Sequence, residues 1–218
     1  MTNLSTDPGS TSGTIVVSGT GRIAVVPDVA DLRLGVTVAR PTADTARAEA
    51  AAAMTAILAA IKGAGVAAPD IRTTLVSVQP RYDYRDNKPP VLTGYELSHV
   101  VELTIRDLAT LGGVIDGSLR AGATSMDALS FRVDDPTQAE RAARLAAMAQ
   151  ARSRADVLAE AAGVAISGVA DIVEGSGVGG PGYPQPKAAR MMLADTATPV
   201  ESGTTEVSVT VTVTYRIA

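Results

Sequence analysis

Cysteine and tryptophan are absent from this sequence, and its 218 residues include one phenylalanine and five tyrosines. Without cysteine there can be no disulfide, no thiolate metal ligand and no cysteine nucleophile. Proteins that stack nucleobases or sugars on side chains usually need more aromatic rings than this chain supplies. We therefore expect a core built from Val, Leu, Ile, Ala and Met side chains.

Positive charge is also scarce, because 19 Lys and Arg face 23 Asp and Glu, a formal net charge of −4. No basic run supplies the electrostatic footprint that nucleic-acid binding requires. No stretch approaches the ~20 apolar residues of a membrane-spanning helix, and residues 1–13 lack a secretory signal pattern. As it stands, the sequence predicts a cytoplasmic protein without nucleic acid as a partner. A periplasmic or cell-envelope location is the expectation if a signal sequence was trimmed.

Hydrophobic periodicity predicts a first subdomain over residues 14–106, after a disordered tail at 1–13. Its elements are in the order ββαββ: strands at 14–26 and 29–39 forming a hairpin, a helix at 41–64, and strands at 70–82 and 94–106. Gly19 and Gly21 interrupt the first strand, which indicates a bulge or kink there.

The second predicted subdomain covers residues 107–218. It contains a helix after Asp107, a strand at 124–133, an alanine-rich helix at 135–163, a short strand at 167–174 and a closing strand at 206–217. This mixed order favours an α+β fold of two intimately packed subdomains. We expect the second part to form a ferredoxin-like αβαβ unit that the C-terminal strand completes.

His99 is the single histidine, and strand alternation places it on the apolar face of residues 94–106. A Ser-His-Asp triad would have to use it, yet no G-x-S-x-G motif supplies the serine. A zinc site with one histidine is also poorly supported. We interpret His99 as a core or subunit-contact residue; a catalytic role is the alternative.

Glycines and carboxylates give no stronger candidate. Gly19-Thr20-Gly21 precedes no helix, which favours a strand kink over phosphate binding, and the glycine-rich residues 175–186 lack the G-K-[ST] of a P-loop. Asp134 and Asp135 are adjacent at a predicted helix start, where one can cap the helix. Asp28 and Asp31 flank a turn and are interpreted as a solvated edge. We predict no catalytic, cofactor-binding or metal residues, and no enzymatic activity.

Several short segments occur in the order found in one known family. They are Gly19-Thr20-Gly21, Pro27-Asp28-Val29-Ala30, Asp70-Ile71-Arg72-Thr73, Pro80-Arg81-Tyr82-Asp83-Tyr84, Gly94-Tyr95, Gly122-Ala123 and Thr198-Pro199-Val200. Together with the alanine-rich helix, they resemble the SIMPL-domain family, a domain of unknown function, across about residues 15–217.

The resemblance implies an α+β fold with two subdomains and, in many bacterial members, a periplasmic or outer-membrane-associated immunogenic protein. Some members assemble into large channel-like rings, and roles in stress tolerance are suggested. An animal member is a kinase-associated signalling molecule. The family has no established catalytic residues, so none is transferred to this chain.

These observations predict a non-enzymatic protein that self-assembles into a homo-oligomer larger than a dimer, with a ring-like form and a stress-related or protein-binding role suggested by the resemblance. Long strands leave sheet edges that a neighbour must cover, and the helix at 139–162 presents alanine around much of its circumference. Two alternatives stay open: a small-ligand module whose mouth is formed by loops 81–90 and 175–186, and an enzyme using His99 or paired aspartates.

Overall fold

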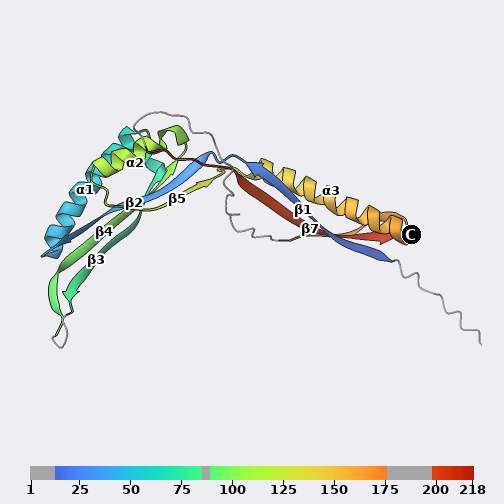
Figure 1. Ribbon diagram of the computed structural model, residues 1–218, viewed down its shortest axis with the longest axis horizontal. Coiled ribbons are helices and arrows are strands. Elements are labelled where there is room, and N and C mark those ends of the chain that lie inside the picture. The colour runs from blue at the N-terminus through green and yellow to red at the C-terminus, as the bar shows by residue number, and fades with distance from the viewer. Residues whose placement is uncertain (1–12, 85–88, 176–197) are drawn as a thin grey trace, which may run out of the picture. The chain divides into compact units, whose positions relative to one another are not determined.

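The computed structural model describes residues 13–84, 89–175 and 198–218 (Figure 1). Helices combined with antiparallel sheets confirm the predicted α+β class. Backbone contacts divide the chain into two units. We call residues 26–84, 89–134 and 198–203 the central unit, and residues 13–25, 135–175 and 204–218 the discontinuous unit.

The central unit contains one four-stranded antiparallel sheet in the order β3-β4-β2-β5. Its strands are β2 (Val29–Arg40), β3 (Ile71–Asp83), β4 (Val91–Ile105) and β5 (Ser125–Arg132). Helices α1 (Ala43–Gly63) and α2 (Leu111–Arg120) connect β2 to β3 and β4 to β5. The connection β-α-β-β-α-β with this strand order is a ferredoxin-like plait.

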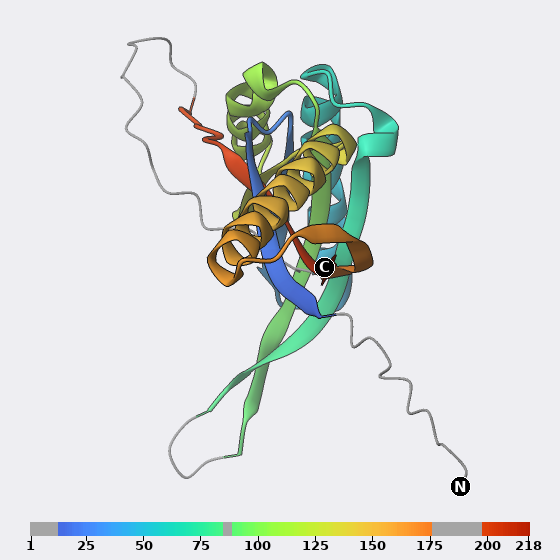
Figure 2. The same cartoon turned by 90° about the vertical axis from the view of Figure 1, so that its right-hand side faces the viewer.

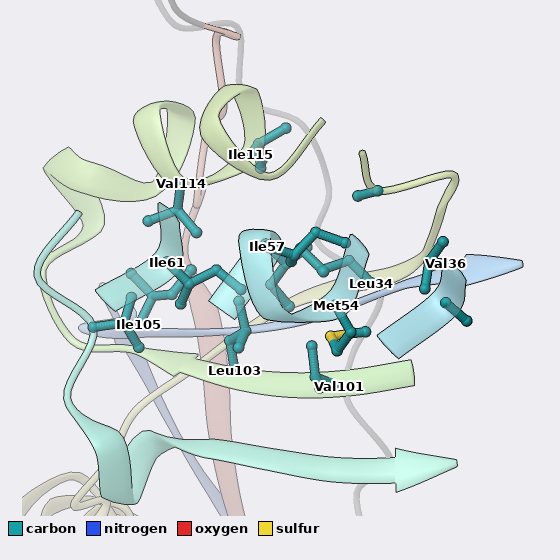
Figure 3. Packing of buried hydrophobic residues seen from close by; sticks show 14 of the residues in the cluster. Leu34, Val36, Met54, Ile57, Ile61, Val101, Leu103, Ile105, Val114 and Ile115 are labelled. Atoms are coloured by element: carbon teal, nitrogen blue, oxygen red, sulfur yellow. The ribbon is translucent and has the colours of Figure 1, made fainter. Parts of the chain in front are cut away.

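Large aliphatic side chains fill the space between the helices and the sheet of the central unit (Figure 3). Helix α1 contributes the predicted stripe of Ala46, Ala50, Met54, Ile57 and Ile61, all buried. Alternate residues of β2 and β4 meet this stripe, because side chains on a strand point to opposite faces in turn. The covered face is therefore apolar and the opposite face carries mostly polar residues.

Two predicted pairings are wrong. Strand β1 (Thr14–Val25) does not form a hairpin with β2 but pairs with β7 (Thr205–Ile217). The ferredoxin-like plait is made by β2 to β5, and β7 does not complete it. Alternation of apolar and polar residues shows which face of a strand is buried, but it does not show which strand lies next to it.

The discontinuous unit is a three-stranded sheet, β1-β7-β6, with β6 at Ile166–Gly175. One face of this sheet packs against α3 (Thr137–Ala162), which lies along β1 and β7 (Figure 2). Five alanines at intervals of four residues form the buried face of the helix: Ala143, Ala147, Ala151, Ala155 and Ala159. Small side chains here allow the backbone of the helix to approach the sheet closely.

Gly19 and Gly21 explain how closely the helix approaches. A β-carbon on Gly19 would lie 2.1 Å from the carbonyl oxygen of Ala147, and one on Gly21 would lie 1.9 Å from that of Ala143. No other residue type fits without displacing the helix. Of the predicted bulge or kink, the bulge is wrong, because the pairing of β1 with β7 is continuous from Thr14 to Val25. Gly19 and Gly21 thus form the part of β1 on which α3 packs, which we call the glycine seat.

Three arginines of α3 make polar contacts within the chain. Arg144 Nε lies 3.0 Å from Glu174, and Arg152 Nε lies 2.9 Å from Asp156. Arg154 donates to the carbonyl oxygen of Ser18 at 2.6 Å. Arg144, Arg152 and Arg154 thus have partners within their own chain.

The boundaries of the two units differ from the predicted division into residues 14–106 and 107–218. Strand β1 groups with α3, β6 and β7, whereas α2 and β5 group with β2, β3 and β4. Residues 1–12 of the predicted tail lie outside the described residues. Gly13 is described, and its carbonyl oxygen accepts a hydrogen bond from Ile217 N at 3.0 Å.

Candidate functional site

Charged side chains gather at the end of the central unit where β5 leads toward α3. Arg132 binds Asp31 (Nε to Oδ2, 2.7 Å) and Asp134 (Nη1 to Oδ1, 2.8 Å). Arg106 binds Asp134 (Nη1 to Oδ2, 2.5 Å) and Asp70 (Nη2 to Oδ1, 3.2 Å). Two arginines and three aspartates thus alternate in one chain of ion pairs, which we call the Arg106–Arg132 network.

The fold places these five side chains on separate elements. Asp31 lies on β2, Arg132 on β5, Arg106 directly after β4, and Asp70 at the end of a short 3₁₀ helix before β3. Their proximity follows from the sheet order, because β2 is the neighbour of both β4 and β5.

Asp28 adds a backbone clamp beside this network. Its carboxylate accepts a hydrogen bond from Asp134 N at 2.8 Å, and its own N–H donates to the carbonyl oxygen of Arg132 at 3.2 Å. Pro27, which precedes it, is buried. These contacts hold two segments, 27–28 and 132–134, side by side where the chain enters and leaves the central unit.

The electrostatics of the network favour its charged form. Hydrogen bonds from Arg132 and then Arg106 lower the pKa of Asp134 below its ordinary value. Hydrogen bonds that Arg132 donates to Asp31 and Asp134 raise its pKa, and those that Arg106 donates to Asp134 and Asp70 raise the pKa of Arg106. A general acid at neutral pH needs a carboxyl pKa raised toward 7. The geometry is that of a structural ion-pair network.

The network contains two of the four predicted carboxylates, Asp31 and Asp134, and Asp28 lies beside it. Asp28 and Asp31 meet Asp134, whereas Asp135 accepts a hydrogen bond from Thr137 N at 3.0 Å and caps the start of α3. Asp28 and Asp31 are therefore not a simple solvated edge. No local motif singled out Arg106 or Arg132, and Asp70 was noted only within the segment Asp70-Ile71-Arg72-Thr73, without a partner.

His99 lies on the helix-covered face of β4, as alternation predicted. It is half-buried, with Val36 of β2 opposite on one side and Val76 of β3 on the other. Apolar neighbours on both sides fit a packing role. In the part of the chain that the structure describes, no hydrogen bond or ion pair of His99 supports the alternative of a catalytic role.

A second polar contact attaches residues 198–203 to the central unit. Thr198 donates from its hydroxyl to Asp116 Oδ1 at 2.6 Å and from its backbone N–H to Asp116 Oδ2 at 3.2 Å. The hydroxyl bond lowers the pKa of Asp116. Val200 packs against the core cluster of the central unit. The Thr-Pro-Val motif thus anchors the chain before β7.

Cavities near the predicted ligand loops are small. A cavity of about 150 Å³ beside Arg81 is lined also by Arg40 and Tyr95, and one of about 180 Å³ lies beside Glu174 and Gly175. Sites for drug-sized ligands usually measure roughly 300–1,000 Å³. An open groove of about 420 Å³ borders Val17 in the discontinuous unit. Residues 85–88 and 176–186 of the predicted ligand mouth lie outside the described residues.

Across residues 13–84, 89–175 and 198–218, no three His, Asp or Glu side chains gather as a set of metal ligands. None of the helices described is long and apolar enough to cross a membrane.

Comparison with known proteins identifies relatives over most of the chain. The 26 kDa periplasmic immunogenic protein of Brucella melitensis is 35% identical over 213 residues, which cover 93% of this chain and 84% of that protein. The protein of the same description from Brucella abortus matches to the same extent. The uncharacterized protein YggE of Escherichia coli K12 is 36% identical over 145 residues, 66% of this chain and 58% of that protein.

A family model described as SIMPL, a protein of unknown function, matches residues 15–215. This span begins in β1, ends in β7 and includes both units. The predicted resemblance is confirmed, and the chain belongs to the SIMPL family.

Proposed function

We propose that this protein is a non-enzymatic assembly protein, which forms a closed homo-oligomer larger than a dimer and acts by binding a protein partner. One observation carries the proposal. Seven large apolar residues of the β3–β4 hairpin are between 40% and 77% exposed: Leu75, Val76, Val78, Tyr82, Tyr84, Val91 and Leu92. Apolar side chains concentrated on one element typically mark an interaction surface.

The hairpin also extends beyond the rest of its sheet. Pairing of β2 with β4 ends at Arg40 opposite Tyr95, whereas β3 and β4 continue to pair as far as Asp83 and Val91 (Figure 2). A two-stranded ribbon without a third neighbour is marginally stable in water. A subunit that packs against this ribbon would stabilise it.

The proposal of a non-enzymatic protein is supported by the chemistry of the Arg106–Arg132 network. Its carboxylates are held in ion pairs with Arg106 and Arg132, the pKa of Asp134 lies below its ordinary value, and each carboxylate has a position that a structural role accounts for. The stress-related role implied by the family stays a prediction. A periplasmic or cell-envelope location is supported by the description of the Brucella relatives, and fractionation of cells expressing the full gene would test it.

Sedimentation velocity of the purified protein tests the assembly. We expect a mass that is more than twice the 22.1 kDa of the chain and that falls on dilution. A mass near 22.1 kDa across the accessible range of concentration and salt would refute self-association.

A further inference from the structure

The four edge strands of the two described sheets differ in how accessible their backbones are. These strands are β1 and β6 in the discontinuous unit and β3 and β5 in the central unit. An edge strand carries a row of N–H and C=O groups that can pair with another chain, and proteins usually cover or disrupt that row.

Side chains of α3 engage the edge of β1. Gln150 accepts a hydrogen bond from Thr20 N at 2.8 Å, and Arg154 donates to Ser18 O at 2.6 Å. These two bonds occupy backbone groups on the side of β1 away from β7. A further strand could not pair with β1 there without displacing both side chains.

Irregular pairing and charge interrupt β5 and β6. Strand β6 has two register shifts against β7 and carries Asp171 and Glu174. Strand β5 has a register shift against β2 and carries Asp127 and Arg132. A register shift bends the backbone of the strand, and charged side chains oppose the close approach of another strand. Both edges are therefore poor templates for a new strand.

Strand β3 has a regular segment without either feature. Its pairing with β4 is unbroken from Leu75 to Arg81, and residues 73–80 carry no charge. Within this segment Leu75, Val76 and Val78 are 40%, 60% and 47% exposed. An uncharged strand can approach an identical strand without like-charge repulsion.

Pro80 shows which backbone groups of β3 are free. A proline has no N–H, so within a sheet it occupies a position whose nitrogen faces away from the neighbouring strand. Val76 and Val78 share this orientation with Pro80, since alternate residues direct their N–H and C=O groups to the same side. Within the described residues, the donors of the regular segment that β4 leaves unpaired are therefore the N–H groups of Val76 and Val78.

We propose that β3 pairs antiparallel with β3 of a second copy of this chain, with Ser77 opposite Ser77 across a two-fold axis. In this register Val76 lies opposite Val78 of the second copy, and each such pair exchanges two N–H···O bonds. Leu75 then lies opposite Gln79. The register uses both free donors and places Pro80 opposite Thr74, which lies outside the regular segment. Centring the axis on Val78 would instead place Pro80 opposite Val76 and leave a free donor and acceptor of the segment poorly paired.

The same register buries the exposed apolar groups. Val76 and Val78 lie on one face of β3, so each valine contacts a valine of the second copy, and such cross-strand pairs stabilise sheets. A two-fold contact of this kind is isologous and closes on itself. The inference rests on the proposed self-association and assigns one of its interfaces.

The first test places a charge on the edge. Val78→Lys should lower the mass in sedimentation velocity by about half relative to the wild type, because a buried isologous contact would then hold two ammonium groups. Val173→Lys is the matched control, since Val173 is 54% exposed on the edge strand β6. Circular dichroism checks that both variants are folded.

The second test exploits the absence of cysteine from the chain. Ser77→Cys should form a disulfide-linked dimer in a glutathione redox buffer, because residues opposite each other at a non-hydrogen-bonded position have closely spaced β-carbons. Gln79→Cys, which faces Leu75 in this register, and Val173→Cys should give far less cross-linking.

The outcomes separate the two proposals. A monomeric wild type overturns the proposed self-association and the inference together. An assembled wild type whose mass is unchanged by Val78→Lys, with no preferential cross-link at position 77, overturns the β3 pairing and leaves self-association standing. A mass lowered by Val78→Lys but not by Val173→Lys, with a cross-link specific to position 77, supports the pairing.

Discussion

The two units bury their helices in contrasting ways. In the central unit, Met54, Ile57 and Ile61 of α1 fill a space between helix and sheet with large side chains. In the discontinuous unit, alanines of α3 rest on the glycines of β1, and backbone atoms come into near contact. The first arrangement depends on the volume of its side chains, and the second depends on the absence of side-chain atoms.

The largest expected effect comes from adding atoms to the glycine seat. Gly21→Val should destabilise the discontinuous unit by at least about 4 kcal/mol. Even the β-carbon would lie 1.9 Å from Ala143 O, far closer than van der Waals contact allows. Gly168→Val is the control, since no atom lies within 4 Å of a β-carbon there. Urea denaturation followed by circular dichroism compares the two. Equal stabilities would mean that α3 does not need the seat.

Removing atoms from the central unit tests the other half of the comparison. Ile57→Ala should lower the free energy of unfolding by about 3 kcal/mol, through lost burial and the cavity it leaves. Leu145→Ala on α3, where the side chain is 65% exposed, should change it by less than about 0.5 kcal/mol. A loss below about 1 kcal/mol for Ile57→Ala would show that the core collapses around the deletion.

A smaller effect is expected at the clamp formed by Asp28. Asp28→Ala removes the acceptor for Asp134 N and should cost about 1 kcal/mol. Asp28→Asn keeps an acceptor oxygen and should recover part of that loss. Thermal melts of both variants provide the measurement. If alanine and asparagine destabilise equally, then the carboxylate charge, rather than the hydrogen bond, sustains the clamp.

The smallest expected effect is on the response to acid. The folded-state pKa of Asp134 lies below its ordinary value of 3.8, and so does that of Asp116. Such groups contribute stability that is complete above the unfolded pKa and is lost as pH falls through the lower, folded pKa. The melting temperature should therefore decline below about pH 4. The melting temperature of the Asp134→Asn variant should decline less steeply with falling pH. A slope equal to that of the wild type would contradict the lowered pKa of Asp134 as a source of the acid sensitivity.

Much of the secondary structure could be predicted because hydrophobic periodicity is local. The stripe from Ala46 to Ile61 and the alternation from Val207 to Ile217 each identify an element and its buried face. Strand partners could not be predicted, because β1 pairs with β7, and the two strands lie at opposite ends of the sequence. The glycine seat was misinterpreted for the same reason: the residues that need Gly19 and Gly21 lie on α3, more than a hundred positions away.

The candidate site was predicted in part. Asp28, Asp31 and Asp134 were recognised as separate carboxylates near turns, and the structure joins them through Arg132. Arginine on a strand surface is common, and no spacing in the sequence links Arg106 with Arg132. Their association depends on sheet order, which only the three-dimensional fold specifies.

The pairing of the first described strand with the last has a consequence for the order of folding. During synthesis from the N-terminus, β1 appears first, yet its register with β7 cannot form until Thr205–Ile217 is available. The stretch of chain from β2 to β5 can form its plait much earlier, because domains generally fold as units while the chain is being made. Strand β1 must stay unpaired through that interval, with its apolar residues exposed. An unpaired strand with exposed apolar residues can aggregate, so completion of the β1–β7 pairing protects the chain once Thr205–Ile217 has been made.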